Sequence, residues 1–243
     1  MKPVLIIRTG RAPDAIRARH GDFPHWFQRV AGLRRERVQL VDVAAGEALP
    51  PAQAVAVAGA IITGSAAMVT ERLPWSERTA GWIRDAMDAG LPLFGVCYGH
   101  QLMAHALGGR VDYLPGGREI GTQPIELSAG QESDPLARIV RDGFRAHTTH
   151  EQSVLEPPAG AAILARSARD PHQLLRYGPS AVSVQFHPEF NAEVMRAYIR
   201  RKHADLRREG ADPERIFRAV GATPMARRLL RQFARLHAWT GPA

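Results

Sequence analysis

The sequence predicts an α/β protein with three layers, in which helices cover both faces of a mostly parallel central sheet. Short continuous apolar runs, beginning with residues 4–7, have the composition of parallel strands that are buried on both faces. Segments whose apolar residues recur three and four positions apart alternate with these runs. This alternation of strands and helices is typical of a sheet enclosed between two helical layers.

Strands and helices are expected to alternate regularly through the first half of the chain. Two of the helices should end just before Gly90 and Gly108, because glycine is favoured immediately after a helix C-terminus. Strands are predicted at residues 4–7, 38–43, 54–62 and 91–96, and helices at residues 23–33, 75–89 and 98–107.

After Gly109, short β-like runs replace the long helices, which predicts an antiparallel or mixed continuation of the sheet. Helices return after Asn191, which can cap a helix, and Asp212-Pro213 and Thr223-Pro224 have the cap-then-proline pattern of two further helix starts. The β-like runs lie at residues 120–127, 153–155, 161–165, 174–177 and 181–186.

The composition excludes several classes of protein. With 243 residues, of which 45% are hydrophobic and 23% charged, the chain can bury a sizeable core and is not expected to be disordered. Its longest apolar stretch, residues 54–62, is too short to span a membrane, and no signal peptide is expected because Arg8 follows the first apolar run at once. Cys97 is the only cysteine, which excludes an intrachain disulfide and a thiolate zinc site and favours a reducing cytoplasm.

The net charge of +8 is concentrated near the C-terminus, because residues 191–243 carry twelve Lys and Arg against five Asp and Glu. We expect one domain over residues 1–200 that carries the chemistry, and an Arg-rich helical extension over residues 201–243 packed on it. A run of positive charge usually belongs to a solvated helix face, so nucleic-acid binding is not the favoured interpretation.

The strongest functional signal is Gly95-Val96-Cys97-Tyr98-Gly99, which lies between a predicted buried strand and a predicted helix. A sharp turn of this kind presents a nucleophile at the carboxyl end of a sheet, here with cysteine in place of serine. The flanking glycines leave room for the strained turn, and the N-terminus of the following helix favours the thiolate, which is the attacking form. The alternative is that a single cysteine is only a small buried hydrophobic residue.

A nucleophilic cysteine needs a base and a group that orients the base. Among the ten histidines, His187 stands out because it follows a predicted strand, and Glu189, beyond the rigid Pro188, can turn back toward the imidazole and fix its tautomer. The alternative is a turn with a solvated histidine and glutamate. His147 and His150 could be metal ligands, but no second cluster completes a metal site.

Two segments, Gly95-Val96-Cys97-Tyr98-Gly99-His100-Gln101 and Gln185-Phe186-His187-Pro188-Glu189-Phe190, resemble the signature motifs of the class I glutamine amidotransferases of the Cys-His-Glu type. They occur in the order that the family has. The resemblance covers about residues 1–200, with Thr63-Gly64-Ser65 after a strand and Arg118-Glu119-Ile120-Gly121 before one. Within the family the chain is similar to the amidotransferase part of GMP synthase and its stand-alone relatives. The resemblance implies the flavodoxin-like fold of this family, with helices on both faces of a mixed sheet.

The resemblance also implies a role for each motif residue. Cys97 would attack the side-chain amide carbon of glutamine, His187 would protonate the departing ammonia and then activate water, and Glu189 would orient His187 and stabilise its charge. The backbone N–H groups of Gly64 and Tyr98 would form the oxyanion hole.

Five residues are implied on the substrate side. Gln101 would shape the glutamine pocket, unless it is only an amide on a helix surface. Thr149-His150-Glu151-Gln152 stands where the family usually has His-Gly-Asp before a strand, and its backbone would bind the α-amino and α-carboxylate groups. Because Glu151-Gln152 replaces Gly-Asp, the way this end of the site binds its substrate is left open.

No cofactor and no metal are implied. The chain has no pyrophosphatase loop of the Ser-Gly-Gly-x-Asp-Ser type, no Walker-type phosphate loop and no dinucleotide fingerprint, so no recognised motif would activate an acceptor with ATP. The expected activity is hydrolysis of glutamine through a cysteinyl γ-glutamyl thioester, giving glutamate and ammonia for a separate synthetase. One alternative is a γ-glutamyl hydrolase or peptidase that acts on γ-glutamyl amides or peptides with the same three residues. Another is a binding module that keeps the fold for docking to a partner, against which the intact Cys97, His187 and Glu189 argue. No membrane partner is expected.

Overall fold

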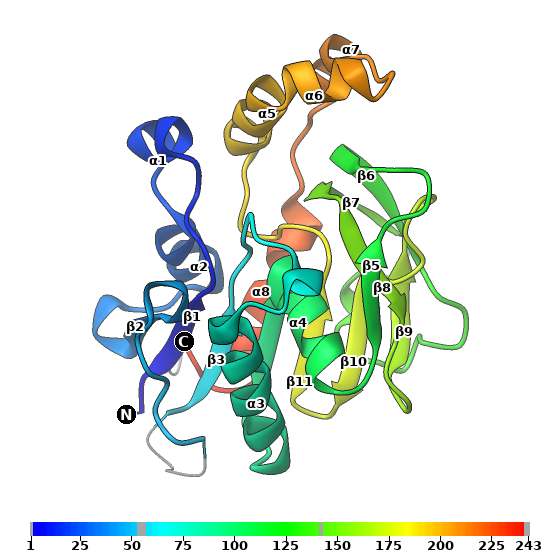
Figure 1. Cartoon of the computed structure of the whole chain (residues 1–243). Coiled ribbons are helices and arrows are strands. Elements are labelled where there is room, and N and C mark those ends of the chain that lie inside the picture. Colours follow the sequence, from blue (N-terminus) through cyan, green and yellow to red (C-terminus); the bar gives the residue numbers. More distant parts are fainter. Residues whose placement is uncertain (1, 53–56, 141–142, 241–243) are drawn as a thin grey trace.

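The computed structural model, which describes residues 2–52, 57–140 and 143–240, has the predicted α/β fold with three layers (Figure 1). Within the described residues, the main sheet has nine strands in the order β2-β1-β3-β4-β11-β10-β9-β6-β7. The strands from β2 to β11 in this order are parallel, and they are β1 (Val4–Arg8), β2 (Val38–Asp42), β3 (Gly59–Ile62), β4 (Leu93–Val96) and β11 (Ala181–Val184). The remaining strands pair antiparallel, and they are β10 (Leu174–Gly178), β9 (Ala162–Arg166), β6 (Glu119–Leu127) and β7 (Phe144–His150).

A small antiparallel sheet and the helices complete the fold. The small sheet pairs β5 (Arg110–Tyr113) with β8 (Gln152–Glu156). The α-helices are α1 (Asp14–His20), α2 (Phe23–Ala31), α3 (Pro74–Asp88), α4 (Tyr98–Ala106), α5 (Ala192–Arg201), α6 (His203–Arg208), α7 (Pro213–Arg218) and α8 (Pro224–Leu236). Short 3₁₀ helices lie at Arg35–Arg37, Val43–Ala45, Val69–Glu71 and Ala137–Ile139.

Strand β1 explains why the fold has three layers. Val4 and Ile6 pack on one side of the sheet in the core that also contains α2 and α8, whereas Leu5 and Ile7 pack on the other side in the core that contains α3 and α4. All four side chains are fully buried. Successive residues of a strand point to opposite faces, so an uninterrupted apolar run is needed where both faces are covered.

The C-terminal helix α8 belongs to the main core beside α2. Its residues Leu229, Leu230 and Phe233 are buried, and so is Trp239 just beyond the helix. The indole N–H of Trp239 donates to the Ala58 carbonyl at 3.0 Å, which ties the end of the chain to the sheet. The division of the chain into domains at residue 200 stays a prediction.

Helices α5, α6 and α7 form a layer of their own above the end of the sheet, which we call the cap (residues 192–218) (Figure 1). The cap packs on the beginning of β6, where Ile120 joins a small apolar cluster. The buried members of that cluster are Ile120, Met195, Ile199, Leu206 and Val220.

Most predicted elements are confirmed with small shifts at their ends. The first predicted helix ends at Ala31 because Gly32 takes the left-handed conformation, with φ of 73°. The predicted strand at 54–62 begins at Gly59, and its residues 54–56 lie outside the described part of the chain. Asn191 caps α5 as expected, with its side chain accepting from the Val194 N–H.

Other predictions of the sequence need correction. Thr223 precedes α8 but does not cap it, because its hydroxyl is buried without a hydrogen bond among the described residues. Helix α1 and strands β5 and β7 were not predicted, and the helix expected after Asn191 is divided at Lys202 into α5 and α6. In α1 only Ile16 is buried, so the helix has no apolar stripe. Strand β7 buries only two apolar residues, Phe144 and Ala146, beside the polar side chains of His147 and Thr148.

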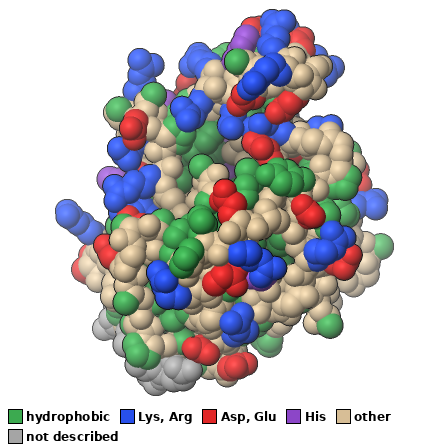
Figure 2. All heavy atoms as spheres, in the orientation of Figure 1, with side chains coloured by type: hydrophobic (Ala, Val, Ile, Leu, Met, Phe, Trp, Pro, Cys, Tyr) green, Lys and Arg blue, Asp and Glu red, His purple; other side chains and the backbone are tan. Residues whose placement is uncertain are grey.

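The positive side chains gather on the upper part of the molecule, over the cap and around the opening beneath it (Figure 2). Negative side chains are interspersed among them on the cap. Among the described helices, none has the length and hydrophobicity needed to cross a membrane.

Candidate active site

Cys97 lies at the turn between β4 and α4, as the sequence predicted. Its backbone has φ of 52° and ψ of −102°, a conformation that costs a non-glycine residue on the order of 1–3 kcal/mol. The glycines on either side make this turn possible, since a Cβ on Gly99 would lie 2.3 Å from the Ile62 carbonyl oxygen and one on Gly95 would lie 2.6 Å from the Gly99 carbonyl oxygen. The strain is thus held in place by close packing of α4 against β3 and β4.

His187 and Glu189 lie just beyond β11, the neighbour of β4 in the sheet. The Nδ1–H of His187 donates to Glu189 Oε1 at 2.7 Å, and both side chains are buried. The backbone N–H of His187 donates to the His147 carbonyl at 2.7 Å, which fixes the imidazole from the main chain. The other ring nitrogen, Nε2, makes no well-formed hydrogen bond within the described residues, so it remains available to a reacting group.

The imidazole of His187 is enclosed by aromatic rings and by charge. Phe190 stacks on it with ring centroids 4.1 Å apart, and Tyr198 of the cap stacks on the far side of Phe190 at 5.0 Å. Burial lowers the pKa of His187, but the negative charges of Glu189 and Cys97 and polar contact with both side chains outweigh burial and raise it to about 10. The arrangement therefore favours the positively charged imidazolium form of His187 beside Cys97.

Two backbone segments lie beside Cys97 and His187, respectively. Tyr98 is the first residue of α4, where N–H groups have no partner inside the helix. Gly64 follows β3 and lies against the imidazole, since a Cβ there would be 3.2 Å from His187 Cε1. The peptide before Gly64 is fixed, because the Thr63 carbonyl accepts from the Gly99 N–H at 3.1 Å and from the Thr9 hydroxyl at 2.9 Å.

A cavity of about 200 Å³ opens beside Cys97 and brings most of the predicted site residues together. Glu189 stands behind His187, and Gly64 adjoins His187 without lining the cavity. The predicted residues that line the cavity are Cys97, Tyr98, Gln101, Thr149, His150, Glu151, Gln152 and His187.

Gln101 is buried and holds one corner of this cavity rather than lying on a helix surface. Its amide Nε2 donates to the Gln152 carbonyl at 2.6 Å and to Gln185 Oε1 at 3.0 Å. His150 Nδ1 also contacts the Gln152 carbonyl at 3.0 Å, and the Gln152 side chain donates to the Thr70 hydroxyl at 2.6 Å. The turn between β7 and β8 is therefore fixed from several sides, and we call residues 149–152 the β7–β8 corner.

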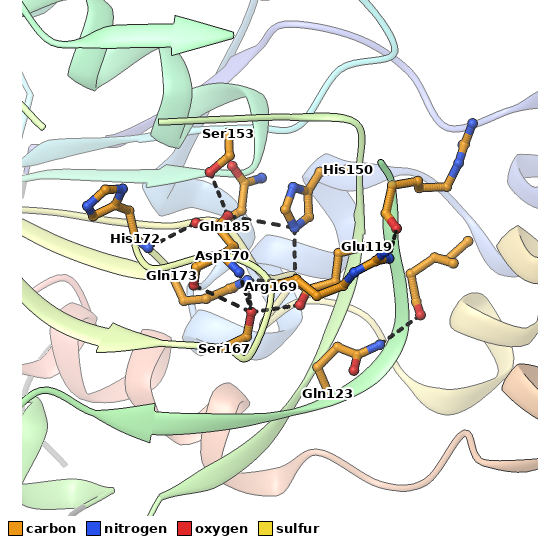
Figure 3. Close-up of polar contacts among 12 residues, drawn as sticks. Glu119, Gln123, His150, Ser153, Ser167, Arg169, Asp170, His172, Gln173 and Gln185 are labelled. Atoms are coloured by element: carbon orange, nitrogen blue, oxygen red, sulfur yellow. Dashed lines mark hydrogen bonds and ion pairs between the residues drawn. The ribbon is translucent and has the colours of Figure 1, made fainter. Parts of the chain in front are cut away.

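A buried polar network supports the β7–β8 corner from behind (Figure 3). His150 Nε2 lies 3.0 Å from Glu119 Oε2 and 3.9 Å from Asp170 Oδ2. Burial lowers the pKa of His150, but the hydrogen bond that its ring donates to Glu119 and the negative charges of Asp170 and Glu119 raise it overall. Glu119 also accepts two further hydrogen bonds, from the Ser167 hydroxyl to Oε1 at 2.6 Å and from the Gln173 amide to Oε2 at 2.7 Å.

Several other residues line the cavity that were not predicted as part of the site. They come from the loop after β1, the start of α2, the loop after β3, the segment before β6 and the cap. Ser65 and Arg118 lie in segments that carry the family resemblance, and Phe23 and Tyr198 belong to helices that the apolar periodicity predicted, but no pattern assigned any of these residues to the site. The missed residues are Arg11, Pro13, Phe23, Ser65, Ala66, Ala67, Met68, Arg118, Tyr198, Arg201 and Lys202. In the part of the chain that the structure describes, no group of three or more His, Cys, Asp and Glu is arranged to hold a metal ion.

Comparison with known proteins gives a consistent result. Residues 27–205 match the sequence model of the family described as glutamine amidotransferase class-I. The GMP synthase [glutamine-hydrolyzing] of Prochlorococcus marinus (strain MIT 9303) is 36% identical over 132 residues, which are 54% of this chain and 24% of that protein. This chain thus spans about a quarter of the length of the GMP synthases that it matches.

Other similarities extend over most of both chains. Gamma-glutamyl peptidase 4 of Arabidopsis thaliana is 26% identical over 198 residues, which are 80% of this chain and 78% of that protein. The crystal structure of a glutamine amidotransferase from Thermotoga maritima superposes with a TM-score of 0.73 over 99% of both chains, at 22% identity. The fold is therefore shared over the full length of that protein.

Proposed function

The chain belongs to the class-I glutamine amidotransferase family, and on that premise we propose that it hydrolyses the side-chain amide of glutamine to glutamate and ammonia through a thioester on Cys97. One observation carries the proposal. Cys97 lies on a strained strand-to-helix turn and lines the same cavity as His187. The Nδ1 atom of His187 is held by Glu189 Oε1 at 2.7 Å. A nucleophile, a base and a group that orients the base are the parts that covalent acyl transfer requires.

In the first half-reaction, the Cys97 thiolate attacks the side-chain carbonyl carbon of glutamine. A C–S bond forms and the carbonyl becomes an oxyanion. As this intermediate collapses, His187 Nε2 gives its proton to the amide nitrogen, the C–N bond breaks, and ammonia leaves. Glu189 keeps the imidazole ring in place and stabilises its positive charge before the transfer.

In the second half-reaction, water attacks the thioester carbonyl. The neutral imidazole of His187 takes a proton from that water, the C–S bond breaks, and glutamate leaves. The thiolate and the imidazolium are then restored, so the cycle consumes one water and needs no other reactant. The same nitrogen serves as acid and then as base.

We place the oxyanion hole at the backbone N–H groups of Tyr98 and Gly64. The first N–H groups of α4 lie at the positive end of the helix dipole, where they favour a developing negative charge. The Thr9 and Thr63 hydroxyls donate to the Gly64 carbonyl, both at 3.1 Å, so this loop is rigid before the substrate arrives. Such preorganised donors stabilise a transition state without reorganisation.

The β7–β8 corner and Gln101 would hold the glutamyl part of the substrate. The fixed backbone of residues 149–152 can bind the α-amino and α-carboxylate groups. Gln152 does not supply the carboxylate that the family usually has here. Glu151 is the only acidic side chain among the described residues that line the cavity, and it is the candidate partner for the substrate α-amino group.

A γ-glutamyl hydrolase or peptidase is the second candidate function. It is favoured by the similarity to a γ-glutamyl peptidase over most of both chains, whereas the similarity to GMP synthases covers about a quarter of their length. The chemistry would be the same, with an amine in place of ammonia as the leaving group. For the first function, we propose that a synthetase on a separate chain uses the ammonia, and that the enzyme works in a reducing cytoplasm that keeps Cys97 as a thiol.

Parallel assays separate these two functions. The purified chain is given glutamine or a panel of γ-glutamyl alkylamides, and ammonia and released amine are measured together. A higher kcat/KM for glutamine supports the glutaminase, and a higher kcat/KM for the alkylamides supports the hydrolase. Absence of product from every γ-glutamyl compound, with Cys97→Ala as the blank, would contradict both.

A further inference from the structure

The cavity beside Cys97 is lined by more positive than negative side chains. Arg11, Arg118, Arg201 and Lys202 line it, whereas Glu151 is the only acidic side chain among the described residues that do so. Glutamine itself carries one positive α-amino group and one negative α-carboxylate group, and its leaving group, ammonia, carries no carboxylate. The cavity therefore has more cationic side chains than are needed to bind the single carboxylate of glutamine.

Two of the four cations are already neutralised at the β7–β8 corner. Arg118 Nη2 lies 2.7 Å from Glu151 and 2.9 Å from Glu209, and its side chain is only 7% exposed. Lys202 Nζ lies 3.7 Å from Glu151 and 3.6 Å from Asp205. These two side chains are bound to carboxylates of the protein and are not free to receive one from a substrate.

The other two cations keep positive charge to spare. Arg11 Nη2 lies 2.9 Å from Asp42, but the same carboxylate oxygen also accepts from Arg8 Nε at 3.0 Å. One carboxylate thus faces two guanidinium groups, and the Arg11 side chain remains 52% exposed. Arg201 has no carboxylate partner among the described residues and faces the cavity without one.

The order of the strands separates Arg11 from the β7–β8 corner. Arg11 follows β1, and the neighbouring Gly10 packs closely on Ser65, which follows β3. The β7–β8 corner begins at the end of β7, on the opposite edge of the sheet, and Cys97 at the end of β4 lies between the two. A γ-glutamyl group at the corner, with its carbonyl at Cys97, would therefore direct its amine part toward Arg11.

Helix α5 brings Arg201 to the same side. Tyr198 stacks on Phe190 above His187, so this face of α5 covers the nucleophile and base. Consecutive residues of a helix are about 100° apart around its axis. Lys202 reaches Glu151 at the β7–β8 corner, so Arg201, one position earlier, is turned about 100° away from that corner around the axis. Helix α1, which follows the Arg11 loop, is one of the helices that pack against α5.

We propose that Arg11 and Arg201 bind a carboxylate on the amine part of the substrate, so that the site prefers γ-glutamyl amino acids to γ-glutamyl amides without that charge. The inference rests on the proposed function, since it uses the same nucleophile and thioester. Cys97 displaces the amino acid by forming the C–S bond as the γ-amide C–N bond breaks, and His187 gives the nitrogen its proton. Water then releases glutamate, so the products are glutamate and one free amino acid. Glutamine would react at the same cysteine without using the two arginines.

The test compares γ-glutamylalanine with γ-glutamylalaninamide, which differ only in the terminal carboxylate. We expect kcat/KM to be about tenfold higher for the acid, a moderate factor because both guanidinium groups are accessible to water. Arg11→Gln and Arg201→Gln should each reduce this ratio, and the double variant should bring it close to one. Arg200→Gln is the matched control, because Arg200 lies over the Phe217 ring at 4.7 Å and does not line the cavity.

Each outcome decides between the alternatives. Equal kcat/KM for acid and amide in the parent enzyme would overturn the inference while leaving the proposed function intact. So would a ratio that Arg200→Gln lowers as much as Arg201→Gln. If hydrolysis of both compounds and of glutamine is absent, the proposed function fails. In that case, the dissociation constants of the two compounds for Cys97→Ala test whether the arginines bind the carboxylate. Equal constants for the acid and the amide would overturn the inference.

Discussion

His187 Nδ1 and Glu189 Oε1 lie 2.7 Å apart, although only Pro188 separates the two residues in the chain. Side chains two positions apart in a strand would point to the same face but not toward each other at this distance. The chain leaves the strand β11 at Val184, so the proline turn can fold the carboxylate back onto the ring. Glu189 therefore fixes the orientation of the His187 ring in the candidate site.

Replacing Glu189 by glutamine should lower kcat by about 10² to 10³. The corresponding loss in a serine protease is about 10⁴, and a cysteine enzyme depends less on the third group because its thiolate–imidazolium pair is already partly formed. Steady-state release of ammonia measures the effect. Glu193→Gln, an exposed residue paired with Arg196, is the control. A parental kcat in Glu189→Gln would mean that Glu189 is only a turn residue, and Glu151 would be tested next.

The same pair should contribute to stability in a pH-dependent way. The pKa of His187 in the folded protein, about 10, lies above its ordinary value of 6.5. Its contribution is therefore fully present below pH 6.5 and is lost as the pH rises through 10. Since Glu189 is one cause of the shift, Glu189→Gln should reduce the free energy of unfolding more at pH 6.5 than at pH 10.5. Urea unfolding at both values measures this, and an equal or larger loss at pH 10.5 would contradict the assignment.

Gly99→Ala should destabilise the protein by about 1–3 kcal/mol and reduce turnover. A Cβ at this position would lie 2.3 Å from the Ile62 carbonyl oxygen, so α4 would have to move away from β3 and carry Cys97 with it. Gly81→Ala in α3 is the matched control, because the nearest atom to its Cβ would be 3.7 Å away. That control should be stabilised by about 0.5–1 kcal/mol, as helix propensity predicts. Thermal unfolding and kcat are the measurements, and equal effects of the two changes would refute the packing argument.

Leu230→Ala should cost about 2–5 kcal/mol of stability, because this side chain of α8 is fully buried in the main core. Leu236→Ala in the same helix should change stability by less than about 0.5 kcal/mol, since Leu236 is 50% exposed. Denaturant unfolding compares the two. Unchanged stability in Leu230→Ala would mean that the helix is a mobile arm rather than part of the core.

The elements around the nucleophile could be predicted from the sequence because local patterns encode them. Residues 91–96 form a short apolar run, and Gly95 and Gly99 around Cys97 specify a strand, a tight turn and a helix. The roles of Cys97, His187 and Glu189 remain predictions, although the structure places them around one cavity.

The positive side of the cavity could not be predicted in this way. Arg11 and Arg201 lie on elements that are far apart in the chain, and periodicity reports which side chains are apolar, not which polar ones converge. Strand β7 was missed for a related reason. Its buried side chains include the polar His147 and Thr148, and its only buried apolar residues are Phe144 and Ala146, so the apolar alternation is too short to detect.

Covalent labelling of Cys97 tests the central claim most directly. A diazo-ketone analogue of glutamine has its ketone carbon where the amide carbon would lie and its diazo carbon in the place of the amide nitrogen. Once the diazo carbon is protonated, the Cys97 sulfur can form a C–S bond to it as N₂ leaves, so the cysteine should be alkylated once per chain. Peptide mass spectrometry should find the label on Cys97 alone, and excess glutamine should protect against it. Cys97→Ser should remain folded by circular dichroism, should take up no label and should release no ammonia. Label on another residue, or parental turnover in Cys97→Ser, would contradict the account.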